Sequence, residues 1–416
     1  MRERDVSKGI ATPSAGFDLA SFCAETPGAS NLVHLNAAGA GLPPRFVTET
    51  VVTHLTREAS VGPHWAAAEA AERLAGVRAS VADLLQCHAH HIAFGGSAGH
   101  LWAMALLAMP ARPGARILVA RSEWASNVLN LLKQKRAGAI AIDVMPFDEG
   151  SGRIDVARAA ALIDERTVAI CLPVVASGSG VRQPVEAIAA LPRPDGCLLF
   201  VDGAQAVGQI RLGMASMGAD VLVAPSRKWL RGPRGEAIMA LSDRALAQLG
   251  DPPILSQAGS EWTSLEGYST RSDAGRFETY EFSVAGRLGL GVAVEYALRC
   301  GINNIRDTIR MRLARLHAGL STIPDVTVFE EIDREPAFLT FGTPSLAPAE
   351  LNRHLAEVNI AAAVVDRQYA RADLEFRGLS AVNRVAPHAY TSEADIDHFL
   401  DAVAAALRRA RWRTAS

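Results

Sequence analysis

An aspartate and a lysine near the middle of the chain form the pair with the clearest chemical meaning. Asp202 directly follows the apolar run 197–201, and Lys228, 26 residues after Asp202, follows a second apolar run at 220–224. An amine can form a Schiff base with an aldehyde cofactor, and a carboxylate opposite a pyridine nitrogen keeps that nitrogen protonated. The pair therefore indicates pyridoxal 5′-phosphate. Taken singly, Asp202 could be a strand-end cap and Lys228 a surface lysine.

The elements that must position this pair follow a βα rhythm between residues 93 and 242. Apolar runs of strand type occur at 116–120, 139–145, 168–175, 197–201, 220–224 and 236–241. Amphipathic stretches at 124–136, 155–164 and 184–191 are long enough to be crossover helices. The alternation predicts an α/β fold with a mostly parallel sheet and helices on both faces, which binds its ligand at the carboxyl ends of the strands.

The pattern changes after the polar residues 257–281, which we interpret as a loop near a domain boundary. We expect helices at 284–299, 302–320, 347–358 and 393–408 and strands at 326–329 and 337–341. This is typical of a smaller α+β unit. The predicted organisation is an N-terminal segment (1–40) packing on the small unit and the active site, a large cofactor domain (41–285) and a small domain (286–416).

Composition limits the partners of the protein. The 416 residues are 49% hydrophobic and 21% charged, with a formal net charge of -2, which is ordinary globular usage without the basic excess that nucleic acid requires. The five cysteines lack the spacing of a disulfide framework or a zinc site, so no metal is expected. Residues 1–16 contain no apolar signal core, and no stretch of 18 uncharged apolar residues follows. We expect a soluble cytoplasmic protein that does not bind membranes.

Residues 198–235 resemble the class V aminotransferase family of fold-type I enzymes, which depend on pyridoxal phosphate. The shared features are a strand ending in DxxQ and a later SRKWLxGPxG segment, and the resemblance extends from Asn36 to about Leu407. It implies a large domain with a mostly parallel seven-stranded sheet, a smaller α+β C-terminal domain and a homodimer. It also implies that Lys228 holds the cofactor, that Asp202 faces its pyridine nitrogen and that Gln205 bonds its phenolic oxygen.

The same resemblance assigns the segment 95–99 to the phosphate group. Backbone N–H groups at a helix start bind a phosphate dianion well, although a Gly-rich turn of this kind is also an ordinary connection from strand to helix. Relatives often carry two hydroxyl residues where this chain has Ser97 and Ala98. Ser226 and Arg227, just before the lysine, would supply the remaining contacts.

Four further residues receive roles from the resemblance. Trp124 would stack on the cofactor ring, Ser177 would lie near its hydroxyl, and Arg384 would fork the substrate α-carboxylate. Asn36 would line the substrate side. The alternatives are a core tryptophan, a loop cap and a surface arginine. One departure concerns the dimer contact, because Tyr280-Glu281 replaces the Gly-Thr pair that relatives carry after their RFE element.

The branch that this chain resembles most includes the hercynylcysteine sulfoxide lyases and related C–S lyases, with cysteine desulfurases and isopenicillin N epimerase-like proteins as further relatives. Desulfurases carry a persulfide-forming cysteine shortly before the carboxylate arginine, and no cysteine follows Cys300 here. The resemblance therefore implies β-elimination from a small amino acid, an S-substituted cysteine or its sulfoxide. A decarboxylating deaminase, an aminotransferase, an epimerase and a non-catalytic binding protein remain alternatives.

Overall fold

The computed structural model describes residues 17–110 and 112–415, so the charged N-terminal stretch 1–16 lies outside the described part. A seven-stranded sheet forms the centre of the molecule, as predicted, and its strand order is β2-β10-β9-β8-β7-β3-β4. Only β10 runs antiparallel to its neighbours within this sheet. The strands are β2 (Ile92–Gly95), β3 (Arg116–Val119), β4 (Ala141–Val144), β7 (Thr167–Pro173), β8 (Leu198–Asp202), β9 (Val221–Pro225) and β10 (Ala237–Leu241).

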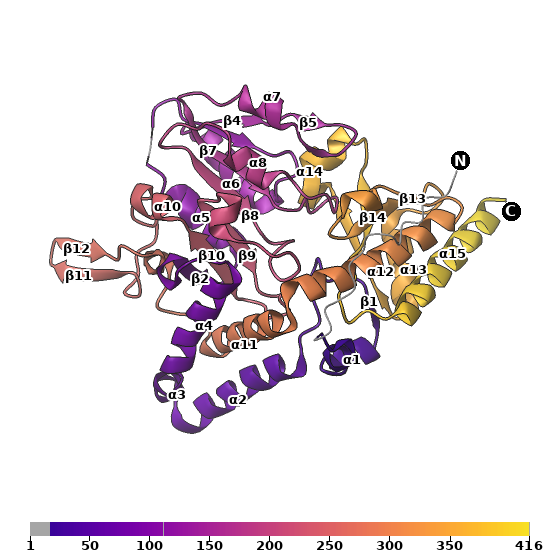
Figure 1. Cartoon of the computed structure of the whole chain (residues 1–416), viewed down its shortest axis with the longest axis horizontal. Coiled ribbons are helices and arrows are strands. Elements are labelled where there is room, and N and C mark those ends of the chain that lie inside the picture. Colours follow the sequence, from indigo (N-terminus) through magenta and orange to yellow (C-terminus); the bar gives the residue numbers. More distant parts are fainter. Residues whose placement is uncertain (1–16, 111, 416) are drawn as a thin grey trace.

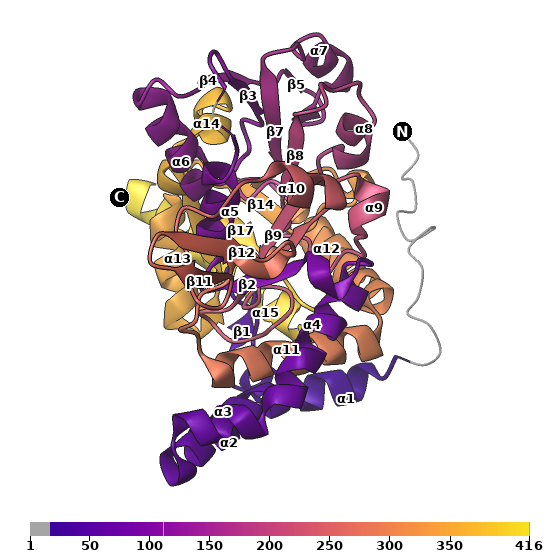
Figure 2. The same ribbon diagram turned by 90° about the vertical axis from the view of Figure 1, so that its left-hand side faces the viewer.

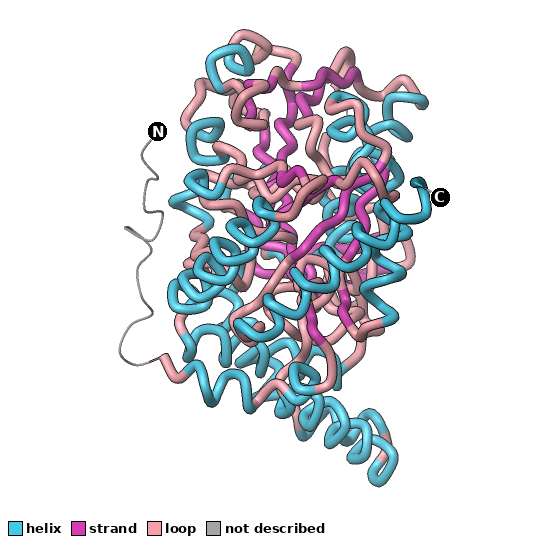
Figure 3. The backbone as a smooth tube through the Cα atoms, turned by 90° about the vertical axis from the view of Figure 1, so that its right-hand side faces the viewer, coloured by secondary structure: helices cyan, strands magenta, loops and turns pink. Residues whose placement is uncertain are grey.

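Both faces of this sheet are covered by helices, which explains why its central strands are continuously apolar. Along β8, Leu199 and Val201 belong to one hydrophobic core, whereas Leu198 and Phe200 belong to the other. Figure 3 shows the strands inside a shell of helices. The connecting helices are α5 (Ala98–Leu107), α6 (Ala125–Arg136), α7 (Val156–Ala160), α8 (Val185–Ala189), α9 (Met214–Met217) and α10 (Asp243–Gln248). A short hairpin pairs β5 (Phe147–Asp148) with β6 (Arg153–Ile154).

The N-terminal helices were not predicted from the sequence. They are α1 (Leu19–Ala24), α2 (Arg45–Val61), α3 (Pro63–Glu69) and α4 (Ala71–Leu84), and α2 and α4 pack against α11 (Val284–Cys300) (Figure 1). Glycines on α11 allow this close packing. A Cβ on Gly289 would lie 2.8 Å from Val51, and one on Gly291 would lie 2.5 Å from Val77.

The polar segment 257–281 is not a plain loop, which corrects the expectation. It contains a hairpin of β11 (Ser260–Ser264) and β12 (Gly267–Thr270) that projects from the body in Figure 1 and lies in front of the body in Figure 2. Its side chains are mostly exposed, so the sequence shows no alternation of apolar and polar residues that would predict these strands. A 3-10 turn, Ala274–Phe277, connects it towards α11.

The C-terminal part forms a smaller α+β unit, as predicted. A four-stranded antiparallel sheet has the order β13-β14-β17-β16, and the two-residue strand β1 (Val33–His34) pairs in parallel with β15 (Ile360–Ala361). The N-terminal segment therefore contacts this unit. The boundaries at 40 and 285 stay a prediction. The other elements are α12 (Ile302–Thr322), β13 (Thr327–Val328), β14 (Leu339–Gly342), α13 (Pro348–Glu357), β16 (Ala363–Asp366), α14 (Arg367–Phe376), β17 (Ala381–Val385) and α15 (Glu393–Ala415).

Candidate active site

Asp202 and Lys228 lie at the same edge of the large sheet. Asp202 is the last residue of β8, Lys228 follows the neighbouring strand β9, and the two strands are parallel. Both side chains are buried, with 6% and 7% exposure. Burial lowers the pKa of Lys228 to about 7; Asp202 opposes this change, and Arg384 and Arg227 add to it. An amine of this kind is partly neutral near pH 7, as a nucleophile or base must be.

The turn that carries Lys228 is held against the N-terminal segment. The Gly41 N–H lies 2.9 Å from the Arg227 carbonyl and 3.3 Å from the Lys228 carbonyl. A Cβ on Gly41 would come within 2.5 Å of that second carbonyl, so only glycine fits at this close approach. Gly41 therefore packs against the turn that carries Lys228, and the place of segment 36–41 on the substrate side stays a prediction.

Arg384 is a buried cation whose charge acts on Lys228. It lies on β17 of the small unit with 8% exposure, and its two terminal nitrogens donate long hydrogen bonds to the Ser177 carbonyl (3.4 Å) and Asn36 Oδ1 (3.5 Å). Its Nε is buried without a partner in the described part of the chain. Burial, and then the charge of Arg227, lower its pKa to about 10. A buried guanidinium without a carboxylate calls for an anionic ligand.

The predicted phosphate segment lies at the open N-terminus of α5. Gly96 and Ser97 are exposed, and Ser97 is the N-cap, whose Oγ accepts the His100 N–H at 3.2 Å. Ala98 is the first helical residue. Of the two other predicted phosphate ligands, Ser226 donates its hydroxyl to the Pro233 carbonyl, and Arg227 donates to the Gly39 carbonyl. Their phosphate contacts stay a prediction.

Aromatic and amide side chains surround the lysine. Trp124 has the Lys228 Nζ 5.5 Å from its ring centre and stacks on Tyr369 of α14, with ring centres 5.7 Å apart. Gln205 is buried; its Nε2 donates to the Ala38 carbonyl at 3.1 Å, and its Oε1 accepts the indole N–H of Trp229 at 3.0 Å. Trp124 thus lies beside the Lys228 amine, and its stacking on a cofactor, like the cofactor contacts of Gln205 and Ser177, stays a prediction.

Sequence reasoning assigned no role to Glu123 and Asn127, which lie against Asp202. Asn127 Nδ2 donates to Glu123 Oε1 at 2.9 Å and to Asp202 Oδ2 at 3.3 Å, and all three residues are buried. The Ala204 N–H donates to the other Asp202 oxygen at 2.7 Å. Burial raises the pKa of Asp202, and the charge of Lys228 opposes that rise. The spacing of four residues between Glu123 and Asn127 was the available signal.

This arrangement fits pyridoxal phosphate by its donor set. Lys228 offers a buried amine for the aldehyde, Asp202 a buried carboxylate for the pyridine nitrogen, and the start of α5 free N–H groups for the phosphate. Arg384 keeps an unpaired Nε for an anionic substrate. The residues present therefore accommodate both a cofactor and an amino acid.

A cluster of two histidines and an aspartate lies outside this constellation. The atoms His90 Nε2, His91 Nε2 and Asp243 Oδ1 lie within 4.8 Å of one another, a cluster able to hold a metal that the sequence analysis did not foresee. However, His91 Nδ1 accepts a hydrogen bond from the His88 N–H, which favours a proton on Nε2. That Nε2 lies 2.8 Å from Asp243 Oδ1. This geometry favours a hydrogen bond from His91 to Asp243 that holds α10 against the residues before β2.

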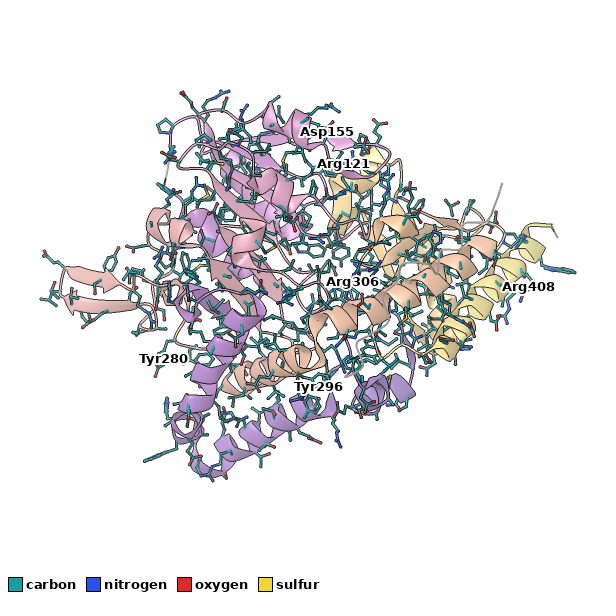
Figure 4. All side chains as sticks on the ribbon, in the orientation of Figure 1. Arg121, Asp155, Tyr280, Tyr296, Arg306 and Arg408 are labelled. Carbon is teal, nitrogen blue, oxygen red and sulfur yellow. The ribbon has the colours of Figure 1, made fainter. Side chains whose placement is uncertain are left out.

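A cavity of about 710 Å³ lies beside the site. It shares Ser179 with the loop that includes Ser177, and neither Lys228 nor Asp202 lines it. Figure 4 shows two lining residues, Arg121 and Arg306, between the large sheet and the small unit. The residues that line this cavity include both acidic and basic side chains.

Comparison with known proteins agrees with this geometry. Residues 33–399 match the family model described as aminotransferase class-V. The chain belongs to the class V aminotransferase family. It is a pyridoxal phosphate-dependent enzyme, as the resemblance implied. A relative in Mycobacterium tuberculosis, named probable hercynylcysteine sulfoxide lyase, is 30% identical over 98% of both chains. A probable cysteine desulfurase of Methanothermobacter thermautotrophicus is 26% identical over 69% of this chain and 71% of its own.

Solved structures share the fold. The apo cysteine desulfurase of Thermococcus onnurineus NA1 superposes with a TM-score of 0.85 at 19% identity, covering 94% of this chain and 98% of that one. The cystine C–S lyase C-DES, in complex with its product cysteine persulfide, gives a TM-score of 0.82 at 19% identity and covers 91% of this chain and 99% of its own. Within the described part of this chain, no helix has the length and apolar character to span a membrane.

Proposed function

We propose that this enzyme is a C–S lyase that carries out β-elimination on an S-substituted cysteine or its sulfoxide. The observation that carries the proposal is the combination of a buried, partly neutral Lys228 with a buried Arg384 whose Nε has no partner among the described residues. Elimination requires a carboxylate anchor, a base for the α-proton and a leaving group on the substrate. The M. tuberculosis relative, which matches almost the whole chain, supports the same reaction class.

Each chain residue has a distinct task in this reaction. Arg384 binds the substrate α-carboxylate and so fixes the orientation of the Cα–H bond. Lys228 Nζ removes the proton from Cα. Pyridoxal phosphate, when bound, would supply the electron sink that makes this proton acidic, and Asp202 would hold a negative charge for its ring nitrogen. The Cβ–S bond then breaks, its electron pair leaves with sulfur, and the aminoacrylate released hydrolyses to pyruvate and ammonia.

Burial raises the pKa of all five cysteine thiols, which makes them poor acceptors of sulfur. Cys171 and Cys197 lie in the cores of the large domain, and burial raises the pKa of both thiols. Tyr369, rather than a thiol, contacts Trp124 from the small unit, 15 residues before Arg384. A desulfurase mechanism that passes sulfur to an enzyme thiolate therefore has no support at this site.

Product analysis with a panel of S-substituted cysteines and their sulfoxides tests the reaction. We expect pyruvate and ammonia in equal amounts, without any added 2-oxo acid. Amino transfer to an added 2-oxo acid would indicate an aminotransferase, CO2 with an aldehyde a decarboxylating deaminase, and inversion at Cα an epimerase. Any of these outcomes without pyruvate contradicts the lyase proposal and leaves the family assignment intact.

We also propose that the enzyme acts in the cytoplasm as a homodimer. The β11–β12 hairpin presents the exposed side chains of Trp262, Leu265 and Tyr268, and Tyr280 lies exposed on the same side of the molecule (Figure 4). Such projecting apolar groups suit burial by a second copy. Light scattering that gives the mass of a monomer at micromolar concentration would contradict the dimer.

A further inference from the structure

Asn127 connects two buried carboxyl groups of the active site. Its Nδ2 carries two hydrogens, and the structure gives it two acceptors, Glu123 Oε1 at 2.9 Å and Asp202 Oδ2 at 3.3 Å. Glu123 and Asp202 are only 3% and 6% exposed. Both amide hydrogens of Asn127 are therefore used within the protein. Glu123 positions the Asn127 amide, and the Asn127 amide in turn positions the Asp202 carboxylate.

Glu123 also fixes the residue beside the reactive amine. Its Oε1 accepts the backbone N–H of Trp124 at 2.8 Å in addition to the Asn127 amide. One oxygen of Glu123 thus anchors both Trp124 and Asn127. Its other oxygen, Oε2, is buried without a partner in the part of the chain that the structure describes.

The surroundings of Glu123 oppose a negative charge on it. The charge of Asp202 on β8, of the same sign, acts on Glu123, and the buried thiol of Cys171 on β7 also interacts with it, whereas Lys228 interacts with Asp202. A carboxylate with a bare oxygen in an apolar interior is strongly disfavoured. Burial, and then the charge of Asp202, raise the pKa of Glu123 to about 8.

We propose that Glu123 is a positioning residue that acts as a neutral carboxylic acid and, through Asn127, holds Asp202 as the single anion facing the cofactor ring. The inference rests on the proposed role of Asp202 and is independent of the reaction that follows. A neutral Glu123 accepts the same two hydrogen bonds as an ionised one but adds no second charge to compete for the proton at Asp202. The essential property is thus the acceptor oxygen and not the charge.

This distinction can be tested with Glu123→Gln, which keeps the acceptor, and Glu123→Ala, which removes it. Asn127→Leu removes the bridge at similar size. Asn130→Ala is the matched control, because Asn130 lies one turn along α6 and donates to the Ser126 carbonyl rather than to a carboxyl group. The measurements are the dissociation constant of pyridoxal phosphate, by fluorescence of the apoprotein, and the pH midpoint of the bound cofactor band. No sulfur substrate is present, so failure here is separate from failure of the lyase proposal.

We expect Glu123→Gln and Asn130→Ala to bind the cofactor within about twofold of wild type with the same pH midpoint. Glu123→Ala and Asn127→Leu should weaken binding about tenfold or more and move the midpoint, because a hydrogen bond to a charged group is lost or misplaced. Equal damage from Gln and Ala at position 123 would show that the charge is needed and would overturn the proposal. Unchanged binding and midpoint in both Glu123→Ala and Asn127→Leu would overturn it as well.

Infrared spectroscopy of the apoprotein gives a second reading if Glu123→Ala does not fold. At pH 7 we expect a protonated-carboxyl band in wild type that Glu123→Gln removes. The absence of any difference in that band between the two folded proteins would contradict a neutral Glu123.

Discussion

Replacement of Arg384 by alanine is the sharpest test of how the substrate is held. The guanidinium is buried, contacts the protein only through bonds of 3.4 and 3.5 Å, and keeps an unpaired Nε. Bonds of this length contribute little to folding. The variant should therefore fold normally and bind pyridoxal phosphate as wild type does.

The expected loss follows from the number of bonds. A forked arginine and carboxylate pair contains two charge-assisted hydrogen bonds, each of which contributes about 1.5–3 kcal/mol. Loss of both costs at least about 3 kcal/mol, which corresponds to a rise in KM on the order of a hundredfold at 1.36 kcal/mol per decade. Much of the loss should appear in KM because the carboxylate is bound before and during the reaction.

Steady-state assays of pyruvate release from one S-substituted cysteine would measure this effect. Arg377→Ala is a matched control, because Arg377 donates at 3.3 Å to the Gly178 carbonyl of the same loop but is paired with Asp373. The control should keep KM within about threefold, since it loses one neutral-acceptor bond and one partly exposed pair. An unchanged KM in Arg384→Ala, with correct folding and cofactor content, would refute the assignment of Arg384 to the carboxylate.

Three further predictions concern the cofactor site and the thiols. Lys228→Met should make the apoprotein more stable than wild type near pH 7, by a few kcal/mol, and the difference should shrink as pH rises towards 10.5. The reason is that the pKa of Lys228 is about 7 in the folded protein and 10.5 in the unfolded chain, so between these values the unfolded wild type binds more protons and its free energy of unfolding rises with pH. Denaturant titrations between pH 7 and 9.5 would contradict this if the difference between variant and wild type stayed constant. Lys133→Met, at an exposed lysine, is the control. Asp202→Asn should lower kcat about a hundredfold or more with an unchanged circular dichroism spectrum, because a neutral amide cannot hold the pyridinium proton, and near-normal turnover would remove Asp202 from the mechanism. A variant with all five cysteines replaced should cleave C–S bonds within about tenfold of wild type, and a greater loss in a folded protein would restore a thiol to the mechanism.

The sequence predicted the elements whose side chains repeat a local pattern. The central strands are buried on both faces, so their apolar runs are unmistakable, and Asp202 and Lys228 follow from the order of those strands. In contrast, α2 has only Val47 and His54 buried among its 17 residues, and its Val51 lies against Gly289 of α11. No sequence window contains that contact.

The site shows the same division between local and distant information. The reactive pair and the N-cap Ser97 are readable because each belongs to one strand end or one helix start. The bridge through Asn127 was missed because it joins residues 75 positions apart, and the stack of Trp124 on Tyr369 joins two domains. Such contacts depend on how the helices α6 and α14 are placed by the whole fold.

The central claim, that Lys228 is the residue that binds pyridoxal phosphate, has one direct test. The sequence contains only three other lysines, Lys8, Lys133 and Lys135, and the latter two lie exposed on α6. Reduction of the purified holoenzyme with borohydride, followed by peptide mapping, should place one cofactor on Lys228, and Lys228→Ala should retain none. A label on another lysine, or equal labelling of the Lys228→Ala variant, would contradict the account.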